Sequence, residues 1–505
     1  MFTLTYGGSI IRTTYSIYLD CAANKNMMGR TLFVGPRCTM TTRNIVGTLE
    51  FTSKYRYGIT SRGAPMYLFC PYDETEPEYI VGSAERDTSR NRIAIVEVGS
   101  VPPAGAGATT TQKPRGNLVR FLGSVGEYTA EVAGLLEFYC PRQKEIKGSS
   151  KEDDEDTTRQ SIDAEHGWIT FHIDPVGCRD IDDAIAYHPE TKVWAITIAD
   201  AAAAIPAGSA LDNAARKAGA TFYDLDGRAV RPMLPPEISE GSASLLPGQR
   251  RRGITLFCPP TGPYTWALTW ITVSHSFSYE SFPASAIAYD LQISRDPHLW
   301  IEELMIRYNT AAATRFRAAG VGLLRTQRAS EDAAGWTAID PELAPFAAEA
   351  ATYEQVDPDS SANQGHASLG LAAYCHASSP LRRYADLVNQ RILTALIRGT
   401  EATAESKLNP TLALVDHLNA RTKASRQWTR DLTFLHHVTP GKVHTIDVTW
   451  LPDNRVWVPA WRRIIRIRHE EENPIGHKGR IQIFCNPTRR NWKRRVLTAA
   501  VVPSI

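Results

Sequence analysis

The chain is poor in several features that would place it in a particular class of protein. It has no stretch of about 18 apolar residues, so no membrane-spanning helix is predicted. No repeat of 20 to 50 residues is visible, which argues against a solenoid. The formal net charge is only +2, so any contact with nucleic acid must depend on local basic patches.

The eight cysteines form neither a zinc-binding pattern nor a disulfide framework, because no CxxC or Cys/His pair has suitable spacing. Reduced thiols, and hence an intracellular location, are expected. The cytoplasm is the first expectation, with a mitochondrial or nuclear location left open. The first nineteen residues contain one arginine and no acid, a weak presequence signal, but their alternating pattern favours a first β-strand.

Changes in residue pattern divide the 505 residues into four parts. Residues 1–140 alternate apolar and polar residues in short runs, as in "RIAIVEV", and predict an all-β region of the barrel type. Residues 141–161 form an acidic linker. Residues 162–435 mix strands with amphipathic helices, expected within 209–219, 299–320, 341–356 and 379–399. Residues 440–505 return to strands and are strongly basic, with Trp461 and Trp492 as candidate surfaces for stacking bases.

The most unusual stretch is "HIDPVGCRDIDDAIAY", residues 172–187, which places Asp174, Asp180, Asp182 and Asp183 between two apolar runs. Those runs, "FHI" and "AIAY", predict buried strands. Carboxylates crowded into a half-buried setting repel one another unless a cation lies among them. Oxygen ligands without His or Cys favour Mg²⁺, or Mn²⁺, over Zn²⁺, and such a cluster suits two-metal hydrolysis of a phosphodiester. The alternative is a solvated acidic turn.

A second candidate group is the arginine pair in "YCHASSPLRRYADLVNQRIL". A serine cap followed by Pro380 predicts that a helix begins here, with Arg382 and Arg383 in its first turn. Helix amides and guanidinium groups together can bind phosphate. The alternative is a surface helix with solvated arginines, which would be the better interpretation if the acidic cluster were absent.

These motifs, together with "ITIADAAAAIPAGSALDNAARKAGATFY", "RPMLPPEISEGSASLLPGQRRRGITL" and "EELMIRYNTAAA", resemble the RNB family of 3′→5′ exoribonucleases, the ribonuclease II, ribonuclease R and exosome catalytic subunit group. They follow the family's order over roughly 165–430. The resemblance implies an α+β fold: a mixed α/β RNB catalytic domain flanked by all-β OB-type barrels. It also implies processive hydrolysis of single-stranded RNA to nucleoside 5′-monophosphates, with two Mg²⁺ ions.

The resemblance further implies roles for individual residues. The four aspartates would be the metal ligands, with Asp182, Asp183 and Arg382 as the catalytic residues. Tyr223 would stack on a base near the 3′ end, with Phe222 as the alternative. Arg382, Arg383 and Tyr384 would contact the RNA.

The chain departs from the family pattern at three places. Thr197 replaces a histidine before "IAD", Ser378 replaces a threonine, and Ser425 stands near where a late-helix glutamate is usual. Two other functions therefore stay open: a catalytically weak RNA-binding or scaffold protein of the same fold, and a phosphodiesterase that acts on DNA.

Overall fold

The structure is a computed structural model of the 505-residue chain. It describes residues 42–99, 113–142, 156–282, 284, 296–330, 335, 338–346, 348–357, 364–400, 409–438, 442–453, 455–467, 474–485 and 496–502. The expected first strand and Trp492 lie outside these residues. No helix within the described ranges is both long and apolar enough to cross a membrane.

The N-terminal part is a closed five-stranded barrel with the strand order β1-β2-β3-β5-β4. Its strands are β1 (Thr42–Leu49), β2 (Met66–Pro71), β3 (Tyr79–Gly82), β4 (Arg92–Gly99) and β5 (Arg115–Ser124). The strands bury one set of large apolar side chains in the barrel interior, among them Phe51, Phe69 and Tyr79. This packing is the reason for the alternating sequence pattern.

The expectation that residues 1–140 are all β is wrong after β5, because Tyr128–Tyr139 form helix α1. Two pairs of its buried residues, Ala130 with Gly134 and Leu135 with Tyr139, are four positions apart, as one face of a helix requires. Gly134 lies against the barrel, where an added Cβ would be 3.0 Å from Ile93. The helix therefore packs onto the barrel as part of the same unit.

The central part contains a seven-stranded sheet in the order β14-β7-β8-β9-β12-β13-β6. Its strands are β6 (Gln160–Ile162), β7 (Ile169–Ile173), β8 (Asp183–His188), β9 (Val193–Ala199), β12 (Arg250–Cys258), β13 (Thr265–Thr272) and β14 (His275–Phe277). The strands predicted from "FHI" and "AIAY" are confirmed as β7 and β8. Short pairs β10 (Phe222–Tyr223) with β11 (Ala229–Arg231), and β15 (Leu323–Thr326) with β16 (Thr352–Gln355), lie apart from this sheet.

Five α-helices accompany these strands among the described residues: α2 (Ala201–Ala204), α3 (Ala210–Ala218), α5 (Pro297–Ala319), α7 (Tyr384–Arg398) and α9 (Leu412–His437). The helices predicted within 209–219 and 299–320 are confirmed. The helix predicted over 341–356 is wrong: Pro341–Phe346 form a short 3₁₀ turn and Thr352–Gln355 form β16. The apolar residues of this segment have helical spacing, but its backbone forms hydrogen bonds with β15 instead. Tertiary pairing therefore overrides the local preference for a helix.

The acidic linker proves shorter than predicted. Residues 143–155 lie outside the described part, but its last residues belong to the central domain: Gln160–Ile162 form β6, and Arg159 is buried. Arg159 Nη2 lies 2.7 Å from the Asp200 carboxylate, and the two side chains are 2% and 1% exposed. Asp200 in turn caps α2 by accepting from Ala203 N. The pair therefore joins the chain before the sheet to a helix that packs on it.

In the C-terminal part, where an OB-type barrel was expected, the described strands form a five-stranded sheet with the order β19-β18-β17-β20-β21. Its strands are β17 (Val443–Leu451), β18 (Arg455–Val458), β19 (Arg463–Arg466), β20 (Lys478–Cys485) and β21 (Val496–Val502). Trp461 is 8% exposed and packs on Phe434 of α9, so it cannot stack on a base as predicted.

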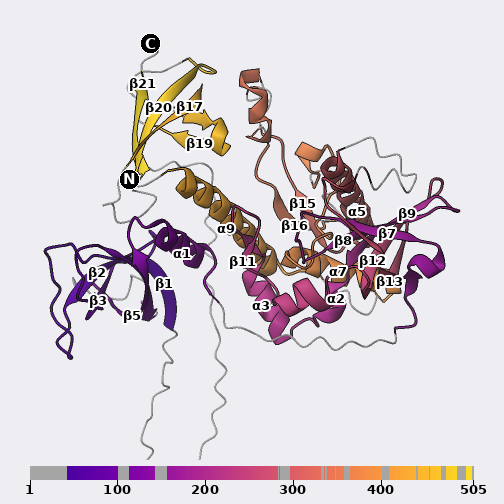
Figure 1. Ribbon diagram of the computed structural model, residues 1–505, viewed down its shortest axis with the longest axis horizontal. Helices are drawn as coiled ribbons and strands as arrows, with labels where there is room; N and C mark the ends of the chain where they lie inside the picture. The colour runs from indigo at the N-terminus through magenta and orange to yellow at the C-terminus, as the bar shows by residue number, and fades with distance from the viewer. Residues whose placement is uncertain are drawn as a thin grey trace, which may run out of the picture.

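Helix α9 connects the three parts. In Figure 1 it lies between the N-terminal barrel and the C-terminal sheet and extends to the central domain. One apolar cluster contains residues of α1, α9 and the C-terminal sheet, including Tyr139, Trp428, Leu432 and Val456. The three parts therefore share a hydrophobic core along α9.

The buried pair of Arg159 and Asp200 can be tested by substitution. Arg159→Met is expected to lower the free energy of unfolding by about 3–5 kcal/mol, because it leaves a buried carboxylate without its cation. Urea unfolding followed by far-UV circular dichroism measures this change. The matched control is Arg90→Met, whose ion pair with Glu127 is largely exposed, and its midpoint should stay close to that of the unchanged chain. Equal midpoints for both variants would contradict a structural role for the pair.

Candidate active site

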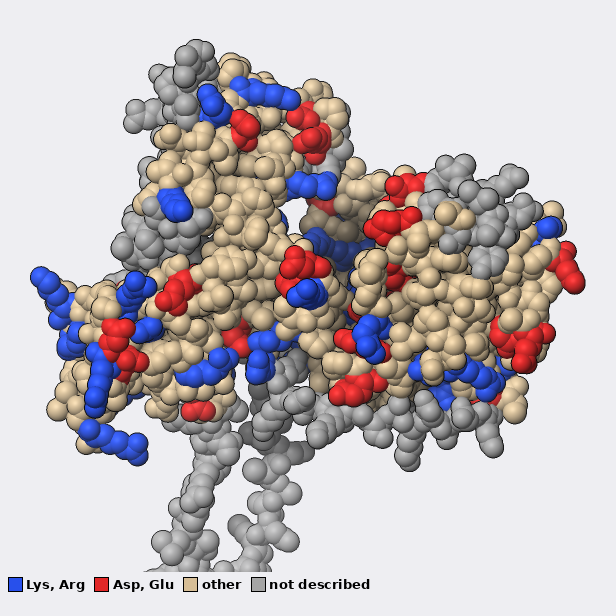
Figure 2. All heavy atoms as spheres, viewed as in Figure 1, with Lys and Arg blue, Asp and Glu red and all other residues tan. Residues whose placement is uncertain are grey.

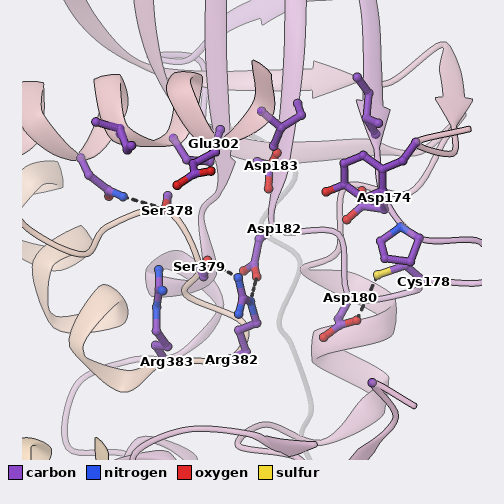
Figure 3. Close-up of a pocket in the computed structure, with 18 of the residues that line it drawn as sticks. Asp174, Cys178, Asp180, Asp182, Asp183, Glu302, Ser378, Ser379, Arg382 and Arg383 are labelled. Atoms are coloured by element: carbon purple, nitrogen blue, oxygen red, sulfur yellow. Dashed lines mark hydrogen bonds and ion pairs between the residues drawn. The ribbon is translucent and has the colours of Figure 1, made fainter. Parts of the chain in front are cut away.

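A cavity of about 550 Å³ lies where the β7–β8 connection meets α5 and the segment before α7 (Figure 3). Charged, polar and apolar side chains all contribute to its wall: Ile173, Asp174, Pro175, Cys178, Asp180, Asp182, Asp183, Tyr223, Gly227, Tyr279, Ile301, Glu302, Met305, Ile306, Asn309, Leu369, Tyr374, Ser378, Ser379, Arg382 and Arg383. All four aspartates singled out from the sequence are among them.

The aspartates reach the cavity because they stand at the ends of two paired strands. Asp174 directly follows β7, and Asp183 is the first residue of β8. Ser244 holds the connection between the strands, because its hydroxyl accepts from Ile181 N and donates to the carbonyl of Arg179. Antiparallel pairing of β7 and β8 therefore brings both ends of the motif to one edge of the sheet.

Asp182 is the most deeply buried of the four, at 4% exposure. Its Oδ1 accepts from Leu381 N at 2.9 Å, and its Oδ2 accepts from Arg382 Nε at 3.1 Å. Burial raises the pKa of Asp182 to about 7, although the Arg382 charge acts in the opposite direction. The two predicted halves of the site are thus in direct contact, across 200 residues of chain.

Asp183 and Asp174 form the other acidic side of the cavity. Burial, followed by the negative charges of Asp174 and Asp182, raises the pKa of Asp183 well above its usual value. Asp174 Oδ2 lies 2.8 Å from His172 Nδ1, whereas no hydrogen-bond donor within the described residues reaches the Asp183 carboxylate. The cavity therefore concentrates negative charge that one arginine only partly balances.

This charge imbalance suits a hard divalent cation, which oxygen ligands bind best and which would favour the ionised carboxylates. The site is not a preassembled cage, however. Over the part of the chain that the structure describes, no three His, Cys, Asp or Glu side chains converge closely enough to hold a metal ion. Asp182 already uses both of its oxygens on Leu381 and Arg382. The ligand chemistry of the aspartates fits Mg²⁺ or Mn²⁺.

The prediction that the arginine pair lies in the first turn of a helix is wrong, because α7 begins only at Tyr384. Arg383 is extended (φ −133°, ψ 125°) and pairs with Ala220 in a β-bridge, so helical hydrogen bonding cannot start earlier. The turn before it is held by Asp386, which accepts from Ser379 N at 2.7 Å. A side-chain carboxylate thus fixes the turn, and both arginines precede the first helical residue of α7.

The two arginines have different partners. Asp386 receives two hydrogen bonds from Arg383, from Nε at 2.8 Å and from Nη2 at 2.7 Å, so a carboxylate already balances that guanidinium charge. Arg382 bonds to Asp182 and to Ser379 Oγ, and its side chain is 43% exposed at the cavity (Figure 3). Arg382 is therefore the better placed of the two to contact a phosphate, and Arg383 mainly holds the turn.

Tyr384 does not line the cavity, contrary to the prediction that it contacts RNA. It is 3% exposed, and its hydroxyl donates to Asp212 Oδ1 at 2.8 Å. As the first residue of α7, it points its ring toward α3 and away from the arginine turn. Its role here is to pack the two helices together.

The two candidate aromatic residues, Tyr223 and Phe222, point in different directions in the structure. Tyr223 lines the cavity, and its hydroxyl donates to Asp180 Oδ2 at 3.3 Å. Phe222 points the other way and is fully buried beneath the guanidinium group of Arg421. Within β10, successive side chains alternate in direction, so only one of the two can face the cavity.

The cavity is also lined by polar residues that were not predicted as site residues, among them Tyr279, Glu302 and Asn309. Glu302 and Asn309 lie on α5, within the "EELMIRYNTAAA" motif, and Figure 3 shows Glu302 beside Asp183. Asn309 Nδ2 donates to Ser378 Oγ at 3.0 Å, so it orients the segment before the arginine turn. Their seven-residue spacing, two helical turns apart, was the available signal for a shared face.

The departures from the family pattern fall at different distances from the cavity. Ser378 lines it and bonds to Asn309. Thr197 is fully buried in β9, where its hydroxyl pairs with that of Thr255 at 2.8 Å. Ser425 lies on α9 and is not among the residues that line the cavity.

Comparison with known proteins agrees with this geometry. The RNB domain family matches residues 162–284 and 342–399, which carry the aspartates and the arginine turn. Ribonuclease R of Helicobacter pylori is 25% identical over 343 residues, which covers 51% of this chain and 53% of that protein. Matches to curated relatives span from 3% to 53% of those proteins' own lengths.

Two solved structures share the fold over most of the chain. RNase R of Mycoplasma genitalium, in complex with ribose methylated single-stranded RNA, has a TM-score of 0.67 at 15% identity and covers 91% of this chain and 90% of its own. Yeast Ssd1, a pseudonuclease, has a TM-score of 0.61 at 14% identity and covers 88% and 67%. By its motifs, its fold and the matched domain, the chain belongs to the RNB-domain family of ribonuclease R and ribonuclease II.

Proposed function

We propose that the chain is a processive 3′→5′ exoribonuclease that hydrolyses single-stranded RNA to nucleoside 5′-monophosphates with two divalent ions, Mg²⁺ in the first place or Mn²⁺. The observation that carries the proposal is that one cavity brings together three kinds of side chain. Asp174, Asp182 and Asp183 supply oxygen ligands, Arg382 supplies a positive charge, and Tyr223 supplies an aromatic ring.

Each of these residues has a role that its position supports. Tyr223 offers a face for the terminal base, which every base can use because all have π-surfaces. Arg382 extends from a turn that Asp386 holds rigid, so its guanidinium group can neutralise charge on the phosphate between the last two nucleotides. Bound divalent ions would activate the attacking water and neutralise the leaving oxygen.

Asp182 has a second role in this scheme. Its bond to Arg382 Nε leaves the terminal nitrogens of the guanidinium group for other acceptors, one of which is Ser379 Oγ. The carboxylate therefore holds the arginine at the cavity that Asp183 and Asp174 also line. Phosphate between these groups would have carboxylate-held cations on one side and the arginine on the other.

Exposed side chains of the N-terminal barrel are suited to bind a single strand. On the N-terminal barrel, the loop after β1 exposes Tyr55 at 78% and Tyr57 at 38%, next to the exposed side chains of Lys54 and Arg62. Aromatic rings among basic side chains bind single strands with little sequence preference. Figure 2 shows an opening between the C-terminal sheet and the central domain, with Lys or Arg side chains beside it.

The second candidate function is RNA binding without turnover. It is favoured by the engagement of both Asp182 oxygens with protein donors and by the shared fold of the pseudonuclease Ssd1. Against it stands the complete set of four aspartates at the cavity. Metal-dependent release of mononucleotides separates the two functions, and matched DNA substrates test the alternative of a DNA phosphodiesterase.

Turnover should depend on a divalent ion and on Asp182. Asp182→Asn keeps an acceptor for Leu381 N but removes a charge that a cation needs, so kcat is expected to fall by about a hundredfold or more. Hydrolysis of 3′-tailed RNA is measured with Mg²⁺ and with chelator. Asp416→Asn, an exposed aspartate of α9, is the control. Full activity of Asp182→Asn would exclude the cluster as the metal site.

The polarity of degradation follows from a cavity that holds one chain end. Single-stranded RNA labelled at its 5′ end should shorten progressively from the other end, and a 3′-phosphate should slow the first cleavage by adding charge beside the aspartates. Denaturing gels resolve the products with time. Early release of a labelled 5′-mononucleotide would mean that the enzyme works in the opposite direction.

The exposed basic residues of the barrel loop should set the salt dependence of binding. Each of Lys54→Gln and Arg62→Gln is expected to reduce the slope of log affinity against log salt by about 0.7, the value for one phosphate contact on a single strand. Fluorescence anisotropy in chelator measures the slopes. Lys192→Gln, at the turn between β8 and β9, is the control. Unchanged slopes in both loop variants would place the RNA elsewhere.

A further inference from the structure

The ring of Tyr223 stands on a small structural element. Strand β10 has two residues and, among the strands that the structure describes, forms a two-stranded sheet with β11, with a register shift between Phe222 and Tyr223. An isolated two-stranded pair is marginally stable in water. The position of the ring must therefore be determined by what surrounds the hairpin.

One side of the segment is attached to the arginine turn. Thr221 N donates to the carbonyl of Arg382 at 2.9 Å, and Tyr384 N donates to the carbonyl of Gly219 at 2.9 Å. Ala220 pairs with Arg383 in the β-bridge. Residues 219–223 and the turn thus form one backbone unit, which carries both the aromatic ring and the phosphate-facing arginine.

The other side of the segment rests on α9. Arg421 Nε donates to the carbonyl of Ala218 at 2.8 Å, and its guanidinium carbon lies 5.2 Å from the centre of the Phe222 ring. Trp428, two helical turns further along α9 and 1% exposed, donates from Nε1 to the carbonyl of Tyr223 at 2.7 Å. Both ends of the short strand are therefore held by side chains of the same rigid helix.

The contact with α9 is close enough to require glycine. A Cβ on Gly219 would lie 2.5 Å from the Cβ of Arg421, and Gly219 has φ +76°. The same guanidinium group also donates from Nη1 to the carbonyl of Tyr139 at 2.9 Å, the last residue of α1. Arg421 thus joins the hairpin to the helix that packs on the N-terminal barrel.

We propose that Arg421 and Trp428 are positioning residues: from α9 they hold the 219–223 segment, and so set where Tyr223 and Arg382 stand in the cavity. Neither side chain lines the cavity. The inference rests on the proposed role of Tyr223 as the residue that stacks on the terminal base. Displacement of a substrate-holding group by about 1 Å, even from a distance, can reduce the rate by up to a hundredfold.

The test uses the full chain and two variants that remove these bonds, Arg421→Met and Trp428→Phe. The matched control is Lys423→Met, an exposed basic residue of the same helix. The probe is single-stranded RNA with 2-aminopurine as its 3′-terminal base, bound in chelator so that no hydrolysis occurs. Stacking on Tyr223 quenches the fluorescence, and Tyr223→Ala defines the signal without stacking.

Both variants should lose most of the quenching while they bind long RNA with an affinity within about threefold of the unchanged chain, because the barrel surface is untouched. With Mg²⁺, kcat should fall by about ten- to a hundredfold for Arg421→Met and less for Trp428→Phe, which loses a single hydrogen bond. Arg421→Lys, which keeps the charge, should recover part of the signal. Lys423→Met should match the unchanged chain in all measurements.

Quenching at the unchanged level in Arg421→Met and Trp428→Phe would overturn the proposal. If Arg421→Met does not fold, Trp428→Phe, which keeps an aromatic ring in the core, decides the outcome alone. Absence of Tyr223-dependent quenching in the unchanged chain would also overturn it. A chain that shows the expected quenching but releases no mononucleotide would overturn the proposed enzymatic function and leave the positioning roles supported.

Discussion

The ion pair between Asp182 and Arg382 is the contact on which the rest of the site depends. A carboxylate at 4% exposure is costly to bury without a positive partner, and the partner comes from a turn 200 residues later. Each group limits the other: the arginine lowers the cost of the buried charge, and the carboxylate holds the arginine at the cavity. The edge of the β7–β8 pair and the turn before α7 must therefore fold together for either to be in place.

The remaining charges follow from that contact. Asp183 and Asp174 face the same cavity, where burial, followed by the negative charges of Asp174 and Asp182, raises the pKa of Asp183 well above its usual value. Arg383, the neighbouring cation, is already paired with Asp386. The cavity is left with a deficit of positive charge, and this deficit, rather than any single residue, is the physical basis for expecting divalent ions.

Helix α9 gives the molecule its second organising feature. It shares a core with α1 and with the C-terminal sheet, and it holds the hairpin of Tyr223 through Arg421 and Trp428. The surfaces that would meet a long RNA and the cavity that would receive its end are thus attached to one rigid element. A short, weakly paired strand can then carry a residue whose position matters, because its stability comes from packing and not from its own ladder.

The sequence by itself determined the elements with strong local signals. The strands before and after the aspartates, the helices of residues 210–218 and 297–319, and the acidic cluster all follow from residue type and period, which act over a few neighbouring positions. Only the tertiary structure decided the rest, because it depends on partners far apart in the chain. Pairing with β15 made residues 352–355 a strand, and a β-bridge to Ala220 delayed α7 to Tyr384. The contact with Asp212 holds Tyr384 away from the cavity, and Asp386 pairs with Arg383. No local pattern encodes such contacts, so a motif could identify the site's residue types but not which of them face the substrate.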